Sequence, residues 1–409
     1  MGANDEAWAK VLEAKARELE CDGQFEIDAA ELKRIGGREP RLMAKHDFST
    51  ARPAPFQELG LNILPVSRSR YVVGRFKIFE PFPNIEGPVR TAHMPAGIES
   101  LGSITSETLA LGAVNLSGML EDFLGGGRLL PTVAGRMSTG TFEMEGLTVD
   151  RAQMEIDGGY ESPEHLVLVE AKNHLAADFN IRQLYFPYRR FQQALSKEVV
   201  PVYLVYTNGI FSLYRYTFRD PARLGSIALV DAARYALSPS RLGYEDVVNA
   251  VRGAEPVEED APFPQANSFA RVVNLVELLA EEPAAREEIS AHYDFDPRQA
   301  DYYANAGRYL GLLEQGEGVW QATELGRKVV SLTDRDARNL AFVRQMARHR
   351  ALRAVLEDTL RAGAVPGRDG IGKHMTGLGL KDSTVARRTS TVQGWAQWVL
   401  DLVGDNTLF

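Results

Sequence analysis

Three residues near the middle of the chain have side chains suited to metal-dependent hydrolysis. Asp157 closes one predicted strand, and Glu170 and Lys172 stand at the end of the next, in the sequence Glu-Ala-Lys. Because side chains alternate along a strand, Glu170 and Lys172 lie on the same face. Two carboxylates, with the Ala171 carbonyl as a further ligand, suit Mg²⁺, which activates a water for attack on a phosphodiester. An adjacent lysine holds or helps to deprotonate that water and offsets the developing negative charge.

Spacing alone leaves a second interpretation open. A Glu-x-Lys pair is commonly an exposed ion pair, so a purely structural cluster of Asp157, Glu170 and Lys172 is the alternative to a catalytic one. Two features favour catalysis. Residues 165–169 form an almost continuous apolar run, which is typical of a strand buried on both faces. Residues 158–163, from Gly-Gly to Pro, give the chain room to turn, so that a hairpin brings Asp157 beside Glu170.

The composition indicates an ordinary globular protein with two or three domains. The chain has 409 residues, 25% of them charged, and a net charge of −9. This total does not exclude nucleic acid, because phosphate binding needs only a local basic surface. Residues 327–361 hold nine Lys or Arg against four Asp or Glu. A solvated helix face is the alternative interpretation of that basic stretch.

Other features exclude several classes of protein. A single cysteine, Cys21, excludes an internal disulfide and a cysteine-based zinc cluster. The charged N-terminus is unlike a signal peptide, and no run of eighteen apolar residues occurs. We therefore expect a cytoplasmic protein without a membrane span.

The chain changes character at residues 253–266, a stretch rich in proline and acidic residues that we interpret as a linker. Mixed α and β patterns precede it, and mainly helical patterns follow. We predict an N-terminal helical and irregular region that is a candidate for DNA contact (1–90), an α/β core with a mixed sheet flanked by helices (91–252), a winged-helix-like domain (267–332) and a C-terminal helical region (333–409).

Periodicity and turn residues predict the individual elements. Asn208-Gly209 is a strong hairpin signal, Ser106 or Thr105 is a candidate helix N-cap, and Asp296-Pro297 is typical of a helix start. The predicted helices cover 5–20, 106–123, 180–196, 267–281, 285–293, 337–362 and two segments within 370–403. The predicted strands cover 71–79, 140–147, 149–157, 165–172, 199–207, 211–218 and 319–323. The segment 38–60 is predicted to be irregular.

The sequence Asp157-x12-Glu170-Ala-Lys172 resembles the motif of the PD-(D/E)XK nucleases. The wider chain is similar to bacterial type II restriction endonucleases in stretches that include Pro40-Arg-Leu-Met-Ala-Lys-His-Asp, Leu61-Asn-Ile-Leu-Pro-Val-Ser-Arg, Thr132-Val-Ala-Gly-Arg-Met-Ser-Thr-Gly and Asp382-Ser-Thr-Val-Ala-Arg-Arg. This resemblance implies Mg²⁺-dependent cleavage of double-stranded DNA at a specific sequence, and a companion DNA methyltransferase. It also implies a glutamine near the site on the following helix, which Gln183 matches. A glutamate on the first core helix is implied as well, for which Glu107 is our choice and Glu121 the second.

Several residues are candidates for DNA contact. Two-fold symmetric DNA favours a homodimer. The third helix of the winged-helix domain would present Arg298 and Gln299 to base edges. The tyrosines 302 and 303 fit either the core or the sugar–phosphate. The other candidates are Arg136, Tyr185, Arg189, Arg387, Arg388 and Gln393.

Three functions remain open at this point. The first is a site-specific endonuclease, and the second is a modification-dependent or repair nuclease with the same core. The third is a catalytically inactive DNA-binding regulator. A winged helix also mediates contacts between proteins, so dimerisation is the alternative role for the C-terminal part.

Overall fold

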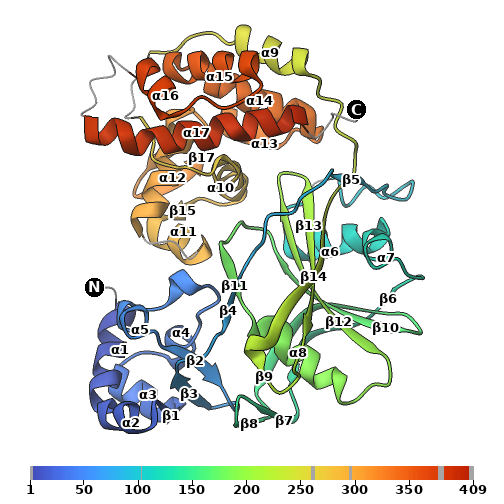
Figure 1. Cartoon of the computed structure of the whole chain (residues 1–409), viewed down its shortest axis with the longest axis vertical. Coiled ribbons are helices and arrows are strands. Elements are labelled where there is room, and N and C mark those ends of the chain that lie inside the picture. The colour runs from blue at the N-terminus through green and yellow to red at the C-terminus, as the bar shows by residue number, and fades with distance from the viewer. Residues whose placement is uncertain (1–2, 103, 259–262, 294–296, 376–381, 405–409) are drawn as a thin grey trace.

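The computed structural model describes residues 3–102, 104–258, 263–293, 297–375 and 382–404. Its fold is mixed α/β, with a central mixed sheet and a helical C-terminal region, which confirms the predicted fold class at this level. The N-terminal part, the sheet and the C-terminal helices occupy three distinct regions of the molecule (Figure 1). In the described part of the chain, every helix is too short or too polar to cross a membrane.

The N-terminal part has its own core, in which Trp8 and Phe56 are fully buried and their rings lie 4.5 Å apart. Its antiparallel sheet has the order β1-β3-β2, from β1 (Gln24–Asp28), β2 (Asn62–Pro65) and β3 (Arg70–Gly74). Its helices are α1 (Ala3–Ala14), α2 (Ala16–Asp22), α3 (Ala29–Gly36), α4 (Pro40–Met43) and α5 (Ala54–Leu59). The segment 38–60, predicted to be irregular, therefore contains two short helices.

The central sheet has seven strands in the order β5-β14-β13-β12-β10-β9-β6. Strands β10 and β12 run parallel, whereas β9 and β10 run antiparallel. The strands are β5 (Arg90–Thr91), β6 (Leu130–Ser138), β9 (Gln153–Glu161), β10 (His165–Lys172), β12 (Glu198–Thr207), β13 (Ile210–Phe218) and β14 (Ile227–Ala236). Two short pairs flank it: β7 (Thr141–Met144) with β8 (Leu147–Asp150), and β4 (Phe79–Pro81) with β11 (Asp178–Asn180).

Helices pack on both faces of this sheet, so β10 is buried on both sides as its apolar run predicts. Leu166 and Leu168 pack in one core with α8 (Arg182–Gln192). Val167 and Val169 pack in another with α6 (Glu107–Leu116) and α7 (Met119–Leu124). One helix was predicted over 106–123, but Gly118 adopts a left-handed conformation (φ 71°) and separates α6 from α7. The predicted N-cap is confirmed, because the Ser106 hydroxyl accepts the Leu109 N–H.

Two glycine-containing turns were predicted, and only one is correct. Asn208 and Gly209 both have positive φ (49° and 72°) and form the tight hairpin turn between β12 and β13. Gly158-Gly159, in contrast, lies inside β9 rather than in the turn after it. A Cβ atom at Gly159 would stand 2.2 Å from the Val133 side chain on β6, so the close approach of the two strands requires glycine there.

The C-terminal part has one hydrophobic core, around Phe269, Phe342 and Trp395. Its helices are α9 (Tyr244–Arg252), α10 (Phe269–Glu281), α11 (Arg286–Tyr293), α12 (Pro297–Tyr309), α13 (Glu324–Val330), α14 (Arg335–Ala347), α15 (Arg350–Ala362), α16 (Arg368–His374) and α17 (Asp382–Gly404). A small sheet has the order β15-β17-β16, from β15 (Ala284–Ala285), β16 (Leu313–Gly316) and β17 (Val319–Ala322). The helix predicted over 337–362 is two helices, α14 and α15, separated at His349, which occupies the N-cap position of α15 and stacks on Tyr309.

Candidate active site

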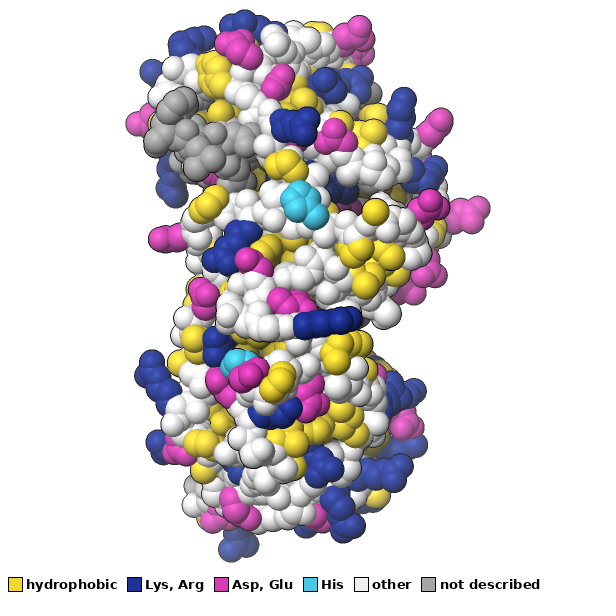
Figure 2. All heavy atoms as spheres, turned by 90° about the vertical axis from the view of Figure 1, so that its right-hand side faces the viewer, with side chains coloured by type: hydrophobic (Ala, Val, Ile, Leu, Met, Phe, Trp, Pro, Cys, Tyr) yellow, Lys and Arg dark blue, Asp and Glu magenta, His cyan; other side chains and the backbone are white. Residues whose placement is uncertain are grey.

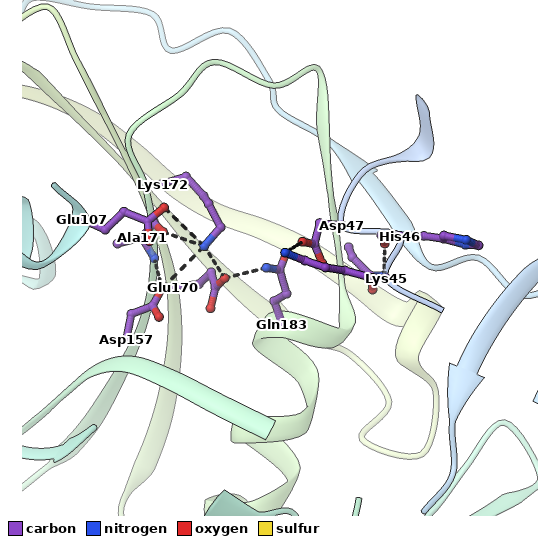
Figure 3. Close-up of polar contacts among 10 residues, drawn as sticks. Lys45, His46, Asp47, Glu107, Asp157, Glu170, Ala171, Lys172 and Gln183 are labelled. Carbon is purple, nitrogen blue, oxygen red and sulfur yellow. Dashed lines mark hydrogen bonds and ion pairs between the residues drawn. The ribbon is translucent and has the colours of Figure 1, made fainter. Parts of the chain in front are cut away.

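Antiparallel pairing of β9 and β10 brings Asp157 to Glu170 and Lys172. Gly158 pairs with Val169 across the two strands, so the residues on either side of this pair are neighbours. The Asp157 carboxylate accepts the backbone N–H of Ala171 at 2.9 Å. The two carboxylates expected to meet therefore lie on adjacent strands of the sheet (Figure 3).

The Lys172 ammonium lies at the centre of this cluster. It donates to the Glu170 carboxylate at 2.7 Å and to the Ala171 carbonyl at 2.8 Å. The Asp157 and Glu107 carboxylates each approach it within 3.7 Å. One ammonium group is thus shared by three carboxylates from β9, β10 and α6 (Figure 3).

Two helices complete the cluster. Gln183, in the first turn of α8, donates its side-chain amide to Glu170 at 2.6 Å. Glu107 is the first residue of α6, so the Ser106 cap places it beside Lys172. Glu121, the second choice for this position, instead accepts the Leu129 N–H at 3.1 Å. The structure therefore brings together Asp157, Glu170, Ala171, Lys172, Gln183 and Glu107.

Burial and crowding of like charges alter the acid–base properties of the cluster. The pKa of Glu170 is raised to about 8, chiefly by burial; the Lys172 ammonium opposes this rise, and the Asp157 and Glu107 charges contribute to it. Burial also raises the pKa of Glu107. For Lys172, burial alone would lower the pKa, but the charges of Glu170, Glu107 and Asp157 outweigh it and raise the pKa. At neutral pH the cluster therefore tends to retain protons.

The donor set fits a hard divalent cation in type and charge. Carboxylate and carbonyl oxygens are the ligands that Mg²⁺ prefers. Three carboxylates share one ammonium, so an excess of negative charge remains when all three ionise. Beside Glu170, Gln183 and Glu155 a cavity of about 10 Å³ has room for about one water. The buried Gln183 side-chain carbonyl oxygen is without a hydrogen-bond donor among the described residues. The described residues also contain no group of three or more His, Cys, Asp or Glu side chains arranged to hold a metal ion.

The structure contradicts two of the predicted DNA contacts. Tyr185 is fully buried, and its hydroxyl donates to the Pro221 carbonyl at 2.6 Å. Arg189 is buried beside it and donates to the Tyr185 hydroxyl and to the carbonyls of Glu143 and Pro221. Both side chains therefore hold α8 against neighbouring loops, and neither is at a surface that DNA can reach.

The other predicted DNA contacts lie in separate places. Arg136 is exposed on β6 and forms a weak pair with Glu155 at 3.3 Å. Arg298 and Gln299 are exposed in the first turn of α12. On α17, Gln393 is half-buried and Arg388 donates to Gln265 at 3.1 Å, while the side chain of Arg387 is outside the described residues, as is Asp296.

The basic stretch 327–361 is partly structural. Arg338 is buried and pairs with Glu277 at 3.6 Å, and Arg353 donates to the Val251 carbonyl at 3.1 Å. The face of the molecule in Figure 2 shows Lys and Arg side chains interspersed with Asp and Glu. Tyr303 is a core residue that bonds Asn267, and Tyr302 is half-buried.

Sequence reasoning did not place residues 45–47 of the N-terminal part beside the cluster, near which they lie in Figure 3. They fall in the segment predicted to be irregular and in one of the stretches that resemble restriction endonucleases, but no spacing signal links them to residues more than a hundred positions later.

Comparison with known families covers most of the chain without naming an activity. Three family models match, each described as a domain of unknown function: DUF6996 over 5–73, DUF6997 over 74–236 and DUF7226 over 271–404. The second spans the seven-stranded sheet and the whole candidate site. No curated protein and no solved structure matches the chain.

Proposed function

We propose that this protein is a Mg²⁺-dependent DNA endonuclease with a PD-(D/E)XK core, acting as a type II restriction enzyme. The observation that carries the proposal is the meeting of Asp157, Glu170 and Lys172 on paired strands, with Gln183 bonded to Glu170. These four residues share one site although up to 26 positions separate them in sequence.

Each residue has a distinct role in the proposed reaction. Asp157, Glu170 and the Ala171 carbonyl would hold the cation, which when bound supplies a Lewis acid for the phosphoryl oxygens and the attacking water. Gln183 fixes the orientation of Glu170. Lys172 would hold or help to deprotonate the water and stabilise negative charge on the phosphate.

The C-terminal part supports recognition of DNA. The order α10, β15, α11, α12, β16, β17 is helix, strand, helix, helix, strand, strand, which is typical of a winged helix. In helix-turn-helix docking the N-terminal residues of the recognition helix contact base edges. Arg298 and Gln299 occupy that position on α12, where arginine suits guanine and glutamine suits adenine. Recognition of symmetric DNA would involve a homodimer, and a separate methyltransferase would protect the host sites.

The test is cleavage of long plasmid and phage DNA, methylated and unmethylated, with Mg²⁺ or with EDTA. We expect discrete fragments from unmethylated DNA with Mg²⁺ only. Asp157→Asn and Lys172→Ala should lower the rate about a hundredfold or more. Glu161→Gln is the matched control, because Glu161 lies on the same strand and pairs with Lys197 at 2.6 Å.

Each alternative gives a different result. Cleavage of methylated DNA alone would indicate a modification-dependent nuclease. Binding without cleavage of either DNA in Mg²⁺ would reject the enzyme and favour an inactive regulator. Full activity of Asp157→Asn and Lys172→Ala would place the active site elsewhere.

A further inference from the structure

A loop of the N-terminal part is fixed against the candidate active site. The docking loop, residues 45–49, packs on β11, the strand that directly precedes α8 and Gln183. The Asn180 N–H donates to the Asp47 carbonyl at 2.9 Å, and the Asn180 amide donates to the His46 carbonyl at 2.7 Å. Ser49 bonds Asp178 through both its backbone N–H and its hydroxyl. The position of the docking loop relative to the cluster is therefore set by several hydrogen bonds.

The chain that leaves Lys172 contacts both the docking loop and the C-terminal part. The ring of His174 lies 5.2 Å from that of Phe48 in the docking loop and 5.0 Å from that of His292 on α11. The Asn173 carbonyl accepts the side-chain amide of Asn274 on α10 at 2.9 Å. All three parts of the molecule thus meet within two residues of the catalytic lysine.

Lys45 is the exposed cation of this junction. Its side chain is 73% exposed and extends from the docking loop toward Gln183 and the carboxylates (Figure 3). Its ammonium pairs with the Asp47 carboxylate at 3.3 Å. Exposed pairs of this kind contribute little stability, so the ammonium can exchange Asp47 for another anion at small cost.

Lys45 is one of three cations whose charges act on His174. The pKa of His174 is lowered to about 3, chiefly by burial, with contributions from His292 and from the charges of Lys172, Arg271 and Lys45. Lys45, Lys172 and Arg271 come from the docking loop, β10 and α10 respectively. All three cations attract an anion that approaches this junction. A phosphodiester backbone brings that anion in the form of regularly spaced phosphates.

We propose that Lys45 binds the DNA phosphate next to the one that is cut, so that the N-terminal part completes the nuclease site. This inference rests on the proposed function. The alternative is that Lys45 is a solvated side chain that pairs only with Asp47.

The experiment measures binding of a labelled DNA duplex by fluorescence anisotropy, in EDTA so that no cutting occurs, over a range of salt concentrations. Lys45→Ala should weaken binding about tenfold, since one charge-assisted contact is lost. The slope of log Kd against log salt should fall by about one, which is the effect of one lost phosphate contact. Lys45→Arg keeps the charge and should bind nearly as the unaltered protein does.

Lys33→Ala is the matched control. Lys33 is also exposed (60%) and pairs with one carboxylate, Glu39, but it lies on α3, which is far from β11 in Figure 1. It should leave both affinity and salt slope unchanged. In cleavage assays Lys45→Ala should raise KM with little change in kcat. A contact to a phosphate other than the reacting one stabilises the bound substrate and the transition state equally.

The results separate the two proposals. Unchanged affinity and slope in Lys45→Ala would overturn the role of Lys45 and leave the nuclease intact. An equal loss in Lys33→Ala would indicate a general charge effect and would also overturn it. If the unaltered protein neither binds nor cuts DNA, the proposed function fails and this inference fails with it. Because Lys45 is exposed, its variants should unfold at the same temperature as the unaltered protein.

Discussion

Replacing Lys172 with methionine tests the geometry of the cluster independently of any activity. Methionine has similar length and no charge, so the substitution removes the ammonium shared by Glu170, Asp157 and Glu107. We expect a loss of stability that grows as the pH rises. The reason is that three carboxylates then face one another without a cation.

The magnitude follows from the distances. At an effective dielectric constant of about 20, a unit pair at 2.7 Å attracts by about 6 kcal/mol and one at 3.7 Å by about 4.5 kcal/mol. The loss of stability is smaller than the sum of these attraction energies, because the carboxyl groups take up protons instead of remaining charged. Protonating a carboxyl of ordinary pKa 4.5 at pH 7 costs about 3.4 kcal/mol. We therefore expect a loss of about 3–5 kcal/mol at pH 7, the usual range for removing one partner of a buried pair.

The sign of the pH dependence follows from the Glu170 carboxyl, whose folded pKa is already raised from 4.5 to about 8. A raised carboxyl pKa contributes stability that is present below 4.5 and is lost as the pH rises through the folded value. Without Lys172 the pKa of Glu170 rises further, so the cost should be small near pH 5 and large above about pH 8. Urea unfolding of both proteins at several pH values measures this loss of stability.

Two variants serve as controls. Lys197→Met removes a lysine that pairs with a single carboxylate, Glu161, at 2.6 Å, so it should cost about 1 kcal/mol with little pH trend. Adding Glu170→Gln to Lys172→Met removes one of the repelling charges and should restore part of the stability. If Lys172→Met unfolded with the same pH profile as the unaltered protein, the three carboxylates would not be gathered around that lysine.

Two further variants probe the fold. His46 is buried and its pKa is lowered, chiefly by burial, to about 4, so its neutral form contributes stability at pH above 6.5 that is lost as the pH falls toward 4. His46→Leu should therefore reduce the acid-induced loss of unfolding free energy by about 3 kcal/mol, measured by urea unfolding between these pH values. Gly159→Ala should destabilise the protein by about 1–3 kcal/mol, because the new Cβ atom collides with Val133. Gly126→Ala is the control, because a Cβ atom there enters open space. Equal melting temperatures of the two variants would contradict the close packing of β6 on β9.

Glu170 and Lys172 could be predicted to lie together because their placement depends on local rules, whereas Gln183 and Glu107 were chosen from the family resemblance. The apolar run of β10 fixes a doubly buried strand, and alternation places Glu170 and Lys172 together at its end. Asn208-Gly209 predicts its hairpin because both residues tolerate positive φ. In each of these cases the information is contained in fewer than ten consecutive residues.

The errors arise where tertiary contacts override local pattern. Tyr185 and Arg189 look like surface residues in sequence, but the carbonyls of Glu143 and Pro221 satisfy them inside the protein. Strand β6 was not predicted, because its residues are mostly exposed and include Pro131 and Gly135, which are uncommon inside strands; pairing with β9 defines it. The docking loop could not be predicted either, since its hydrogen bonds join residues about 130 positions apart.

The energetics of the cluster bear on the choice between a structural and a catalytic role. Burying an ion pair costs desolvation energy that the Coulomb attraction seldom exceeds, and apolar residues of similar volume usually stabilise a protein as well or better. In this cluster the desolvation energy exceeds the Coulomb attraction by more than in a simple pair, because three carboxylates share one ammonium and Glu170 is almost completely buried. A cluster selected only for stability would not retain two surplus carboxylates next to Glu170. Excess negative charge of this kind is useful where a cation binds, and on that basis we favour catalysis over a structural role.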